Sequence, residues 1–265
     1  MFRTDPKSGE EMAHRVIDPD HYAPVDATVT VPEDRRCWSV SWPGYAPVKI
    51  TPPELRPAAL TQHVPNWVVD RAATPDLVPN WEQRQADALI PFELERGWPL
   101  HPHGRTGRTG RNLGRWGENQ AADPIVVAGT NEQRWVLLIT RDDIQQEAIP
   151  GGMVDPGETA PAALVRELRE ETGIDLANQQ PTILGRQVVE DWRNTDHAWV
   201  ASTSALYQLP AQVTATAGDD AADAGWWPFG SLQQLEAAVT AAGRTLYAAH
   251  RPLLLRAFEY LNQQS

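Results

Sequence analysis

The stretch GGMVDPGETAPAALVRELREETGI, from Gly151 to Ile174, places a turn with three glycines and a proline in front of a helix. Thr159 can cap the start of this helix, and Gly173 can end it. The helix carries Glu167, Glu170 and Glu171, whose like charges repel one another. A cluster of this kind needs either solvent around it or a cation within it.

Helical geometry places the three glutamates on one side of the helix. At 100° per residue they fall inside an arc of about 100°. The neighbouring stripe is apolar and would seat the helix on a sheet: Leu164, Val165 and Leu168. Arg166 stands four residues before Glu170 and can brace it, but one arginine cannot neutralise three carboxylates.

Two interpretations of this acidic face are open. Three glutamates in five residues, taken alone, favour a solvated helix face. Clustered hard oxygen ligands also suit Mg²⁺, which binds through carboxylates, waters and substrate phosphates together. Glycines in the preceding turn let the backbone approach a ligand, so a carbonyl there is a further candidate ligand.

The spacing of the whole segment decides between them. Five residues separate Gly152 from Glu158, and seven separate Glu158 from the run Arg166-Glu167-Leu168. Single residues then separate this run from Glu170-Glu171, and Glu170-Glu171 from Gly173-Ile174. This pattern resembles the Nudix box at every position. Nudix enzymes hydrolyse a nucleoside diphosphate linked to another moiety, and the box forms a loop-helix-loop on an α/β/α sandwich.

The resemblance implies a role for each matching residue. Glu167, Glu170 and Glu171 correspond to the ligands of a divalent metal, usually Mg²⁺ with Mn²⁺ as an alternative, and the Gly152 carbonyl is a further candidate ligand. Glu158 and Arg166 correspond to residues that orient the site.

Segments outside the box extend the likeness to a narrower family. They are GRTGRTGRNLGRWGENQAADPIV (104–126), AIPGGMVDPGE (148–158), DWRNTDHAW (191–199) and LYAAH (246–250), with CWSVSWPGYAPVKITPPEL (37–55) in the first half. These resemble the eukaryotic-type ADP-ribose pyrophosphatases, whose module also occurs as an ADP-ribose sensor at the C-terminus of a melastatin-type cation channel. The likeness implies hydrolysis of ADP-ribose to AMP and ribose 5-phosphate. A different nucleoside diphosphate substrate, such as a sugar nucleotide or a dinucleotide, and an ADP-ribose sensor without hydrolysis remain the alternatives.

The flanking segments also supply candidate substrate contacts. Arg193 and Asn194 lie between two predicted strands, where an arginine can reach a phosphate or ribose. Tyr247 and His250 stand three apart on one face of a helix predicted over residues 244–261, in a segment that the family uses for its ligand. Arg115 and Trp116, near the end of the basic segment of residues 101–117, are the remaining candidate substrate contacts. For each of these residues the alternative is a packing role, which we favour for most arginines of residues 105–115.

The rest of the chain divides into two parts. Up to about residue 102 it is rich in proline and tryptophan, with short alternating segments at CWSVSW (37–42) and PVKITP (47–52) that predict strands. Strands are then predicted in RWVLLIT (134–140), PTILGRQVV (181–189) and HAWVASTSALYQL (197–209), and a helix in GSLQQLEAAVTAAG (230–243). We therefore expect an α/β fold, a Nudix-type sandwich with a mixed sheet between helices, preceded by a smaller domain with short strands. The predicted units are an N-terminal substrate-assisting cap region at 1–115 and a Nudix catalytic domain at 116–265.

Composition restricts the partners. The 265 residues carry a formal net charge of −12, which argues against nucleic acid or an anionic membrane as a partner. An anionic substrate such as ADP-ribose then needs metal ions or a local cluster of arginine. The single cysteine, Cys37, excludes an intrachain disulfide and predicts a reducing, cytoplasmic location. Residues 1–25 contain no apolar run, so we expect no signal peptide, and the simplest expectation for the oligomeric state, which the sequence leaves open, is a monomer.

Overall fold

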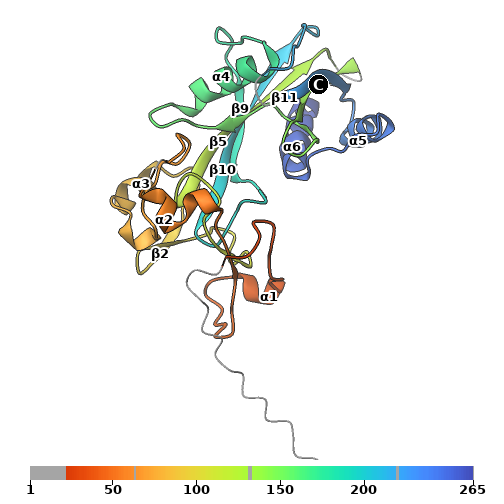
Figure 1. Ribbon diagram of the computed structural model, residues 1–265. Helices are drawn as coiled ribbons and strands as arrows, with labels where there is room; N and C mark the ends of the chain where they lie inside the picture. The colour runs from red at the N-terminus through yellow and green to blue at the C-terminus, as the bar shows by residue number, and fades with distance from the viewer. Residues whose placement is uncertain (1–21, 63, 131–132, 219–220, 265) are drawn as a thin grey trace, which may run out of the picture.

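A computed structural model describes residues 22–62, 64–130, 133–218 and 221–264 (Figure 1). The expectation about a signal peptide concerns residues 1–25 and therefore falls mostly outside the described residues. Among the described residues, no helix is both long and apolar enough to cross a membrane.

A seven-stranded mixed sheet forms the centre of the molecule. Its strands run in the order β11 (Ala221–Pro228), β6 (Trp135–Arg141), β5 (Gly117–Ala128), β10 (Ala198–Leu209) and β9 (Thr182–Val188). Two short strands complete it: β7 (Glu147–Ala148) beside β6, and β8 (Gly152–Met153) beside β5. β5 and β10 pair in parallel over their full length, whereas the other pairs are antiparallel. The predicted mixed sheet is confirmed.

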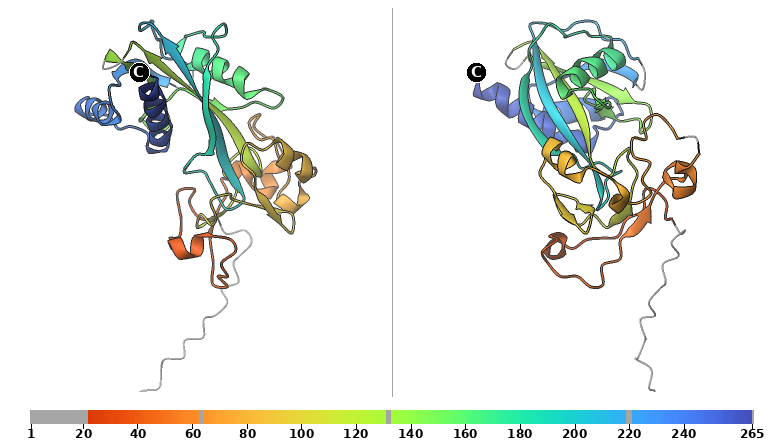
Figure 2. Two further views of the ribbon diagram at one scale, coloured as in Figure 1. Left: turned by 180° about the vertical axis from the view of Figure 1, so that it is seen from behind. Right: turned by 90° about the vertical axis from the view of Figure 1, so that its left-hand side faces the viewer.

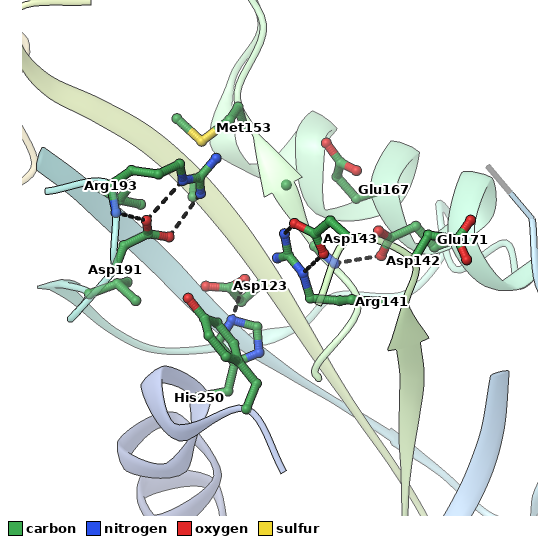
Figure 3. A pocket seen from close by; sticks show the side chains of 16 residues that line it. Asp123, Arg141, Asp142, Asp143, Met153, Glu167, Glu171, Asp191, Arg193 and His250 are labelled. Carbon is green, nitrogen blue, oxygen red and sulfur yellow. Dashed lines mark hydrogen bonds and ion pairs between the residues drawn. The ribbon is translucent and has the colours of Figure 1, made fainter. Parts of the chain in front are cut away.

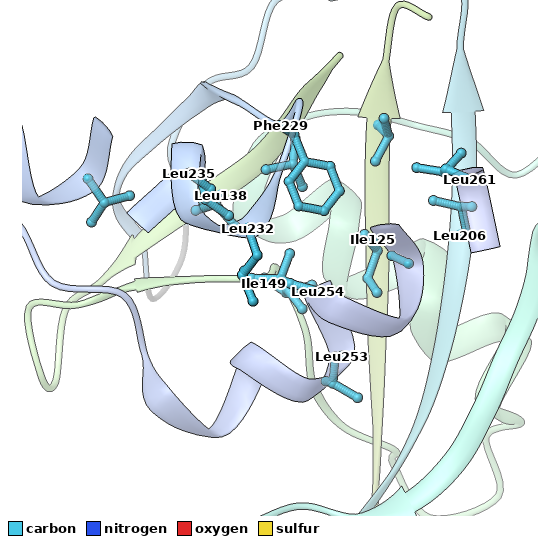
Figure 4. Close-up of a cluster of buried hydrophobic side chains, with 14 residues drawn as sticks. Ile125, Leu138, Ile149, Leu206, Phe229, Leu232, Leu235, Leu253, Leu254 and Leu261 are labelled. Atoms are coloured by element: carbon cyan, nitrogen blue, oxygen red, sulfur yellow. The ribbon is translucent and has the colours of Figure 1, made fainter. Parts of the chain in front are cut away.

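Helices cover both faces of this sheet (Figures 1 and 2). Successive residues of β5 point to opposite faces, so Ile125 packs among the leucines of α5 (Leu232–Ala241) and α6 (Arg251–Gln263), as Figure 4 shows. Val126 instead packs with Leu168 of α4 (Ala160–Thr172) on the other face. The predicted sandwich of helix, sheet and helix is thereby confirmed.

Both ends of α4 follow the sequence signals. The Thr159 hydroxyl accepts a hydrogen bond from the Ala162 backbone N–H at 3.4 Å. Gly173 adopts φ 69°, in the left-handed region that favours glycine, and its N–H donates to the Arg169 carbonyl. These caps fix where the helix begins relative to the glycine turn, and so fix which side chains face the sheet.

The N-terminal region consists of short elements around the end of the sheet where β5 and β10 begin (Figures 1 and 2). They are α1 (Glu33–Arg36), β1 (Val48–Ile50), a 3-10 turn (Pro53–Leu55), α2 (Pro57–Leu60), a second 3-10 turn (Pro75–Leu77), α3 (Trp81–Asp87), β2 (Glu93–Glu95), β3 (Trp98–Leu100) and β4 (Arg108–Gly110). The strand predicted in PVKITP is confirmed as β1, which pairs in parallel with β4. The strand predicted in CWSVSW is wrong, because residues 37–40 form bends and turns and residues 41–42 have no regular secondary structure.

The basic segment of residues 101–117 joins the N-terminal region to the sheet. The buried guanidinium of Arg105 donates to the carbonyls of Arg35, Cys37 and Val40 at 2.7 to 3.0 Å. The buried carboxylate of Asp196 accepts from the backbone and hydroxyl of Thr106, and from the Tyr45 hydroxyl, at 2.7 to 2.8 Å. These contacts support the packing role for Arg105.

The chain before α6 differs from the prediction. The helix expected over residues 244–261 begins only at Arg251, after a 3-10 turn at Ala248–His250. Tyr247 is extended, and its N–H donates to the Glu147 carbonyl at 2.7 Å, while the Glu147 N–H donates to the Thr245 carbonyl at 2.8 Å. Strand-like pairing with β7 therefore takes the backbone groups that a helix would use.

Candidate active site

A cavity of about 350 Å³ opens beside the glycine turn, where β5, β8, α4 and the 3-10 turn before α6 meet (Figure 3). Six carboxylates line it: Asp123, Asp142, Asp143, Glu167, Glu171 and Asp191. Two arginines, Arg141 and Arg193, face the same space, together with Tyr247 and His250. Six carboxyl groups against two guanidinium groups make the lining of this cavity predominantly acidic.

The glycine turn lies directly against the glutamates of α4. A Cβ added to Gly152 would stand 2.6 Å from the Glu167 Oε1 atom, a distance that real Cβ atoms essentially never show. The Glu171 carboxylate is buried and accepts a hydrogen bond from the Gly151 N–H at 2.8 Å. The absence of a side chain at Gly152 is thus what allows the backbone and the carboxylates to share one wall of the cavity.

Arg166 ties the acidic residues of the box together. Its guanidinium donates to Glu158 at 2.8 and 2.9 Å, to Glu167 at 2.8 Å and to Glu170 at 3.0 Å. A fourth partner is the Met153 carbonyl at 3.0 Å. The predicted brace between Arg166 and Glu170 is confirmed, and the arginine also connects the helix to the loop that carries Glu158.

The electrostatics of Glu167 favour a cation next to its carboxyl group. Burial raises the pKa of this carboxyl to about 7, although the charge of Arg166 opposes the shift. A cation beside it would restore the ionised form, because it replaces the solvation that burial removes. Within the described residues, no three acidic, histidine or cysteine side chains already stand close enough together to hold a metal ion. The donor set of carboxylates beside a glycine carbonyl nevertheless fits a hard divalent cation such as Mg²⁺.

Arg193 is held rigidly on the opposite wall. Its Nε and Nη2 atoms donate to the two oxygens of Asp191, each at 2.8 Å, and its backbone N–H donates to the same carboxylate. Burial alone would raise the pKa of Asp191, but the hydrogen bonds and charge of Arg193 hold that pKa below its usual value. Asp191 is therefore an ionised, buried anchor that orients the arginine toward the cavity.

Tyr247 and His250 form the floor next to a buried aspartate. Their rings lie 4.9 Å apart in a T-shaped arrangement. His250 Nδ1 accepts from the Ile149 N–H at 3.0 Å, which leaves the proton of the neutral ring on Nε2, 3.9 Å from the Asp123 Oδ1 atom. Burial lowers the pKa of His250 and raises that of Asp123, although each is opposed by the partner's charge. The Ser202 hydroxyl also donates to Asp123.

Other predicted residues lie away from this cavity. Asn194 is buried, with its amide donating to the Val189 carbonyl and its oxygen accepting from the Val200 N–H. Trp116 is 5% exposed, and its indole N–H donates to the Ala72 carbonyl. Both side chains have structural partners, and neither lines the cavity.

A second cavity of about 600 Å³ adjoins the first and shares Met153 and Arg193 with it. Arg115 and Glu158 line this second cavity, together with Trp67, which is 50% exposed. Glu170 lies outside both linings, linked to the site through Arg166. The structure thus brings Gly152, Glu167, Glu171, Arg193, Tyr247 and His250 together at one cavity, with Arg115 and Glu158 next to it.

Models of two known protein families match successive parts of the chain. A model of the NUDIX domain matches residues 119–249, and a model of the NUDT9-like N-terminal domain matches residues 31–117. A putative nudix hydrolase 6 from Caenorhabditis elegans is 33% identical over 230 residues, which cover 79% of this chain and 86% of that protein. The chain belongs to the Nudix family.

Two further relatives share both regions of this Nudix chain. The mitochondrial ADP-ribose pyrophosphatase of Rattus norvegicus is 31% identical over 240 residues, which cover 74% of this chain and 66% of that enzyme. A transient receptor potential cation channel, subfamily M member-like 2, from Nematostella vectensis is 31% identical over 231 residues, which cover 71% of this chain and 14% of the channel. The chain therefore spans about two thirds of the rat enzyme and a small part of the channel.

Solved structures match slightly more than half of the chain. A MutT/nudix family protein from Enterococcus faecalis is 22% identical and covers 56% of this chain and 63% of its own, with a TM-score of 0.45. The Nudix domain of NrtR from Shewanella oneidensis, crystallised with ADP ribose, is 19% identical and covers 55% of this chain and 89% of its own, with a TM-score of 0.44.

Five charged residues that line this cavity were missed by the sequence analysis: Asp123, Arg141, Asp142, Asp143 and Asp191. Asp123 interrupts the apolar run of β5, Asp191 stands two residues before Arg193 of the RNTD motif, and Arg141 is the last residue of β6, directly after RWVLLIT. A charged residue inside or directly after a buried strand is a usable signal, because such a charge is costly to bury without a partner or a function.

Proposed function

We propose that this Nudix chain hydrolyses ADP-ribose to AMP and ribose 5-phosphate in a reaction that depends on Mg²⁺, with Mn²⁺ as an alternative. The observation that carries the proposal is one cavity that joins Glu167 and Glu171 of the box to Arg193, Tyr247 and His250 of the flanking motifs. The likeness to the rat ADP-ribose pyrophosphatase supports ADP-ribose as the substrate.

The glutamates of α4 are the proposed metal-binding residues. Glu167, Glu170 and Glu171 would hold the ion with the Gly152 carbonyl, and Arg166 and Glu158 would orient them. A divalent metal there supplies neutralisation of phosphate charge, polarisation of the phosphoryl oxygens and a bound water of lowered pKa. This fits a cavity whose acidic lining would otherwise repel an anionic substrate.

The opposite wall is the proposed grip on the substrate. Arg193 directs Nε and Nη2 at Asp191, which holds the guanidinium in place before the ligand arrives, and its Nη1 edge would donate to phosphate oxygens. His250 presents an Nε2 proton as a donor, since its Nδ1 is engaged by Ile149. Tyr247 adds an aromatic face and a hydroxyl that is protonated at neutral pH, as an ordinary tyrosine is, and burial raises its pKa further, to about 12.

The two adjoining cavities match a long, two-ended substrate. A diphosphate beside Arg193 would leave one nucleoside or ribose end in the first cavity and direct the other into the second, past Met153. Arg115 and Trp67 would meet that second end. The N-terminal region contributes Trp67, which agrees with its proposed role in assisting substrate binding.

Product analysis tests the proposal. The chain is incubated with ADP-ribose and Mg²⁺, and the products are separated by chromatography, with a parallel reaction in excess chelator. We expect equal amounts of AMP and ribose 5-phosphate, and no turnover without divalent metal. Undiminished turnover in chelator would refute the metal-binding role of the glutamates. Tight binding of ADP-ribose with no products in Mg²⁺ or Mn²⁺ would support the sensor instead.

Other expectations from the sequence stay predictions. The net charge of −12 predicts no nucleic acid or membrane partner, and a monomer is the simplest state. The cytoplasmic location likewise stays a prediction, and the rat relative carries the word mitochondrial in its own name. The boundary between the two folding units near residue 115 also stays a prediction.

A further inference from the structure

The cavity contains two arginines that are held in similar ways. Arg193 is paired with Asp191, and Arg141 is paired with Asp143. In each case the carboxylate lies two residues away along the chain and accepts two hydrogen bonds, which for Arg141 measure 2.9 Å from Nε and 2.7 Å from Nη2. In both pairs, Nε and Nη2 of the guanidinium group thus donate to a carboxylate of the protein itself.

The two pairs differ in burial. The side chain of Asp191 is 6% exposed, whereas that of Asp143 is 51% exposed. A buried carboxylate cannot lose its arginine without leaving an uncompensated charge, so the Asp191 pair is permanent. A half-exposed carboxylate can exchange its arginine for water at little cost. Arg141 is therefore the arginine that can be released.

The released arginine would stand at the cavity. Arg141 lines it, and its guanidinium carbon lies 5.6 Å from the centre of the Tyr247 ring. In Figure 3 the pair of Arg141 and Asp143 lies between the glutamates of α4 and the pair of Arg193 and Asp191. Because Arg141 and Arg193 line the same cavity, we expect a phosphate bound there to meet both guanidinium groups.

We propose that Arg141 is a second phosphate-binding residue and that Asp143 occupies its fork until the diphosphate of the substrate displaces it. The carboxylate of Asp143 presents two oxygens in the same planar arrangement that a phosphate offers to a guanidinium. Asp143 therefore competes with the substrate, and it selects ligands whose phosphates hold Arg141 more strongly than one exposed carboxylate does. This inference rests on the proposed function only in placing a diphosphate in the cavity.

The loop offers a matched control for the competing charge. Asp142 is the adjacent residue, is also exposed, and also lines the cavity, but the fork of Arg141 bonds to Asp143. Removing either carboxylate reduces the repulsion of an anionic ligand by one nearby charge. Only the removal of Asp143 also frees the arginine, so the difference between the two substitutions isolates the competition.

The test is a double-mutant cycle on ligand affinity. The variants are Asp143→Asn, Asp142→Asn and Arg141→Gln, with each aspartate change repeated in the Arg141→Gln background. The probes are a non-hydrolysable methylene analogue of ADP-ribose, inorganic pyrophosphate and adenosine, each titrated in Mg²⁺. Circular dichroism confirms that every variant is folded.

We expect Arg141→Gln to weaken the analogue and pyrophosphate about tenfold and to leave adenosine unchanged. Asp143→Asn should tighten both phosphate ligands about threefold more than Asp142→Asn does. In the Arg141→Gln background the two aspartate changes should become equal, since no fork remains to be freed.

Two results would overturn the proposal. Equal effects of Asp143→Asn and Asp142→Asn in the parent protein mean that Asp143 does not compete. Unchanged affinity for pyrophosphate and the analogue in Arg141→Gln means that Arg141 does not contact phosphate. Either result leaves the proposed function intact if ADP-ribose is still cleaved. Conversely, if another nucleoside diphosphate derivative is the substrate, the pyrophosphate cycle still decides the role of Arg141.

Discussion

The substitution Glu170→Gln separates the metal-binding interpretation of α4 from the structural one. The Glu170 side chain is 37% exposed, and its bond to Arg166 is one of several that this arginine makes. A half-exposed i,i+4 pair contributes about 0.3–0.5 kcal/mol, so the free energy of unfolding should change by less than about 0.5 kcal/mol. If Glu170 binds the metal, kcat should fall by about 10²-fold, which is about 2.7 kcal/mol of transition-state stabilisation.

The control for this substitution is Glu236→Gln on α5. Glu236 is 35% exposed and makes one ion pair, with Arg251 at 2.7 Å, so it matches Glu170 in burial and in its arginine partner but lies outside both cavity linings. Steady-state kinetics with ADP-ribose and chemical denaturation are measured for both variants. Near-parental kcat in Glu170→Gln, with a larger loss of stability than in Glu236→Gln, would refute the metal-binding role.

Three further predictions concern the grip on the substrate and the joint between the two parts of the chain. Arg193→Ala should weaken the non-hydrolysable analogue by roughly 1.5–3 kcal/mol in calorimetric titration, and Arg193→Lys should weaken it too, because lysine cannot reproduce the planar fork; unchanged affinity in both variants would place Arg193 outside the binding site. The double change Glu170→Ile with Glu171→Leu should abolish cleavage while the Kd for ADP-ribose stays within about tenfold, since lost metal binding and reduced repulsion nearly cancel; lost binding in a folded protein would show that the metal holds the substrate. Asp70→Ala should destabilise the fold by about 2–4 kcal/mol in denaturation, because buried Asp70 accepts two bonds from Arg84 and one from the Trp116 N–H; an unchanged midpoint would contradict this.

The sequence predicted those elements whose signals are local. The helix over the box was predictable at both ends because Thr159 and Gly173 cap it through their own chemistry. The strands β6, β9 and β10 were predicted from their own apolar segments, whereas the central strand β5, which Asp123 and Pro124 interrupt, and the edge strand β11 were not predicted. Patterns of this kind depend on neighbours within a few residues.

The secondary-structure predictions were wrong where a group distant in the sequence forms hydrogen bonds with the backbone. CWSVSW alternates like a strand, but the carbonyls of Cys37 and Val40 accept hydrogen bonds from Arg105 rather than from a neighbouring strand. The segment before α6 has helical periodicity, but Glu147 pairs with the backbone of Thr245 and Tyr247. No window of the sequence contains both partners of these interactions.

The residues of the candidate site were likewise predicted where they belong to a continuous motif and missed where they do not. The glutamates of α4 and Arg193 were found because they belong to continuous motifs. Asp123 and Asp191 were missed, since their importance arises from the side chains that fold against them, His250 and Arg193. The placement of Asn194 and Trp116 also depends on packing that the motifs do not encode.

The most direct test of the proposed substrate is a comparison of kcat/KM. ADP-ribose is measured beside a sugar nucleotide and a dinucleotide under identical Mg²⁺ concentrations, with the same preparation of the chain. We expect the largest kcat/KM for ADP-ribose, with AMP and ribose 5-phosphate released in equal amounts. A larger kcat/KM for either of the other compounds would contradict the assignment and identify a Nudix hydrolase with a different substrate.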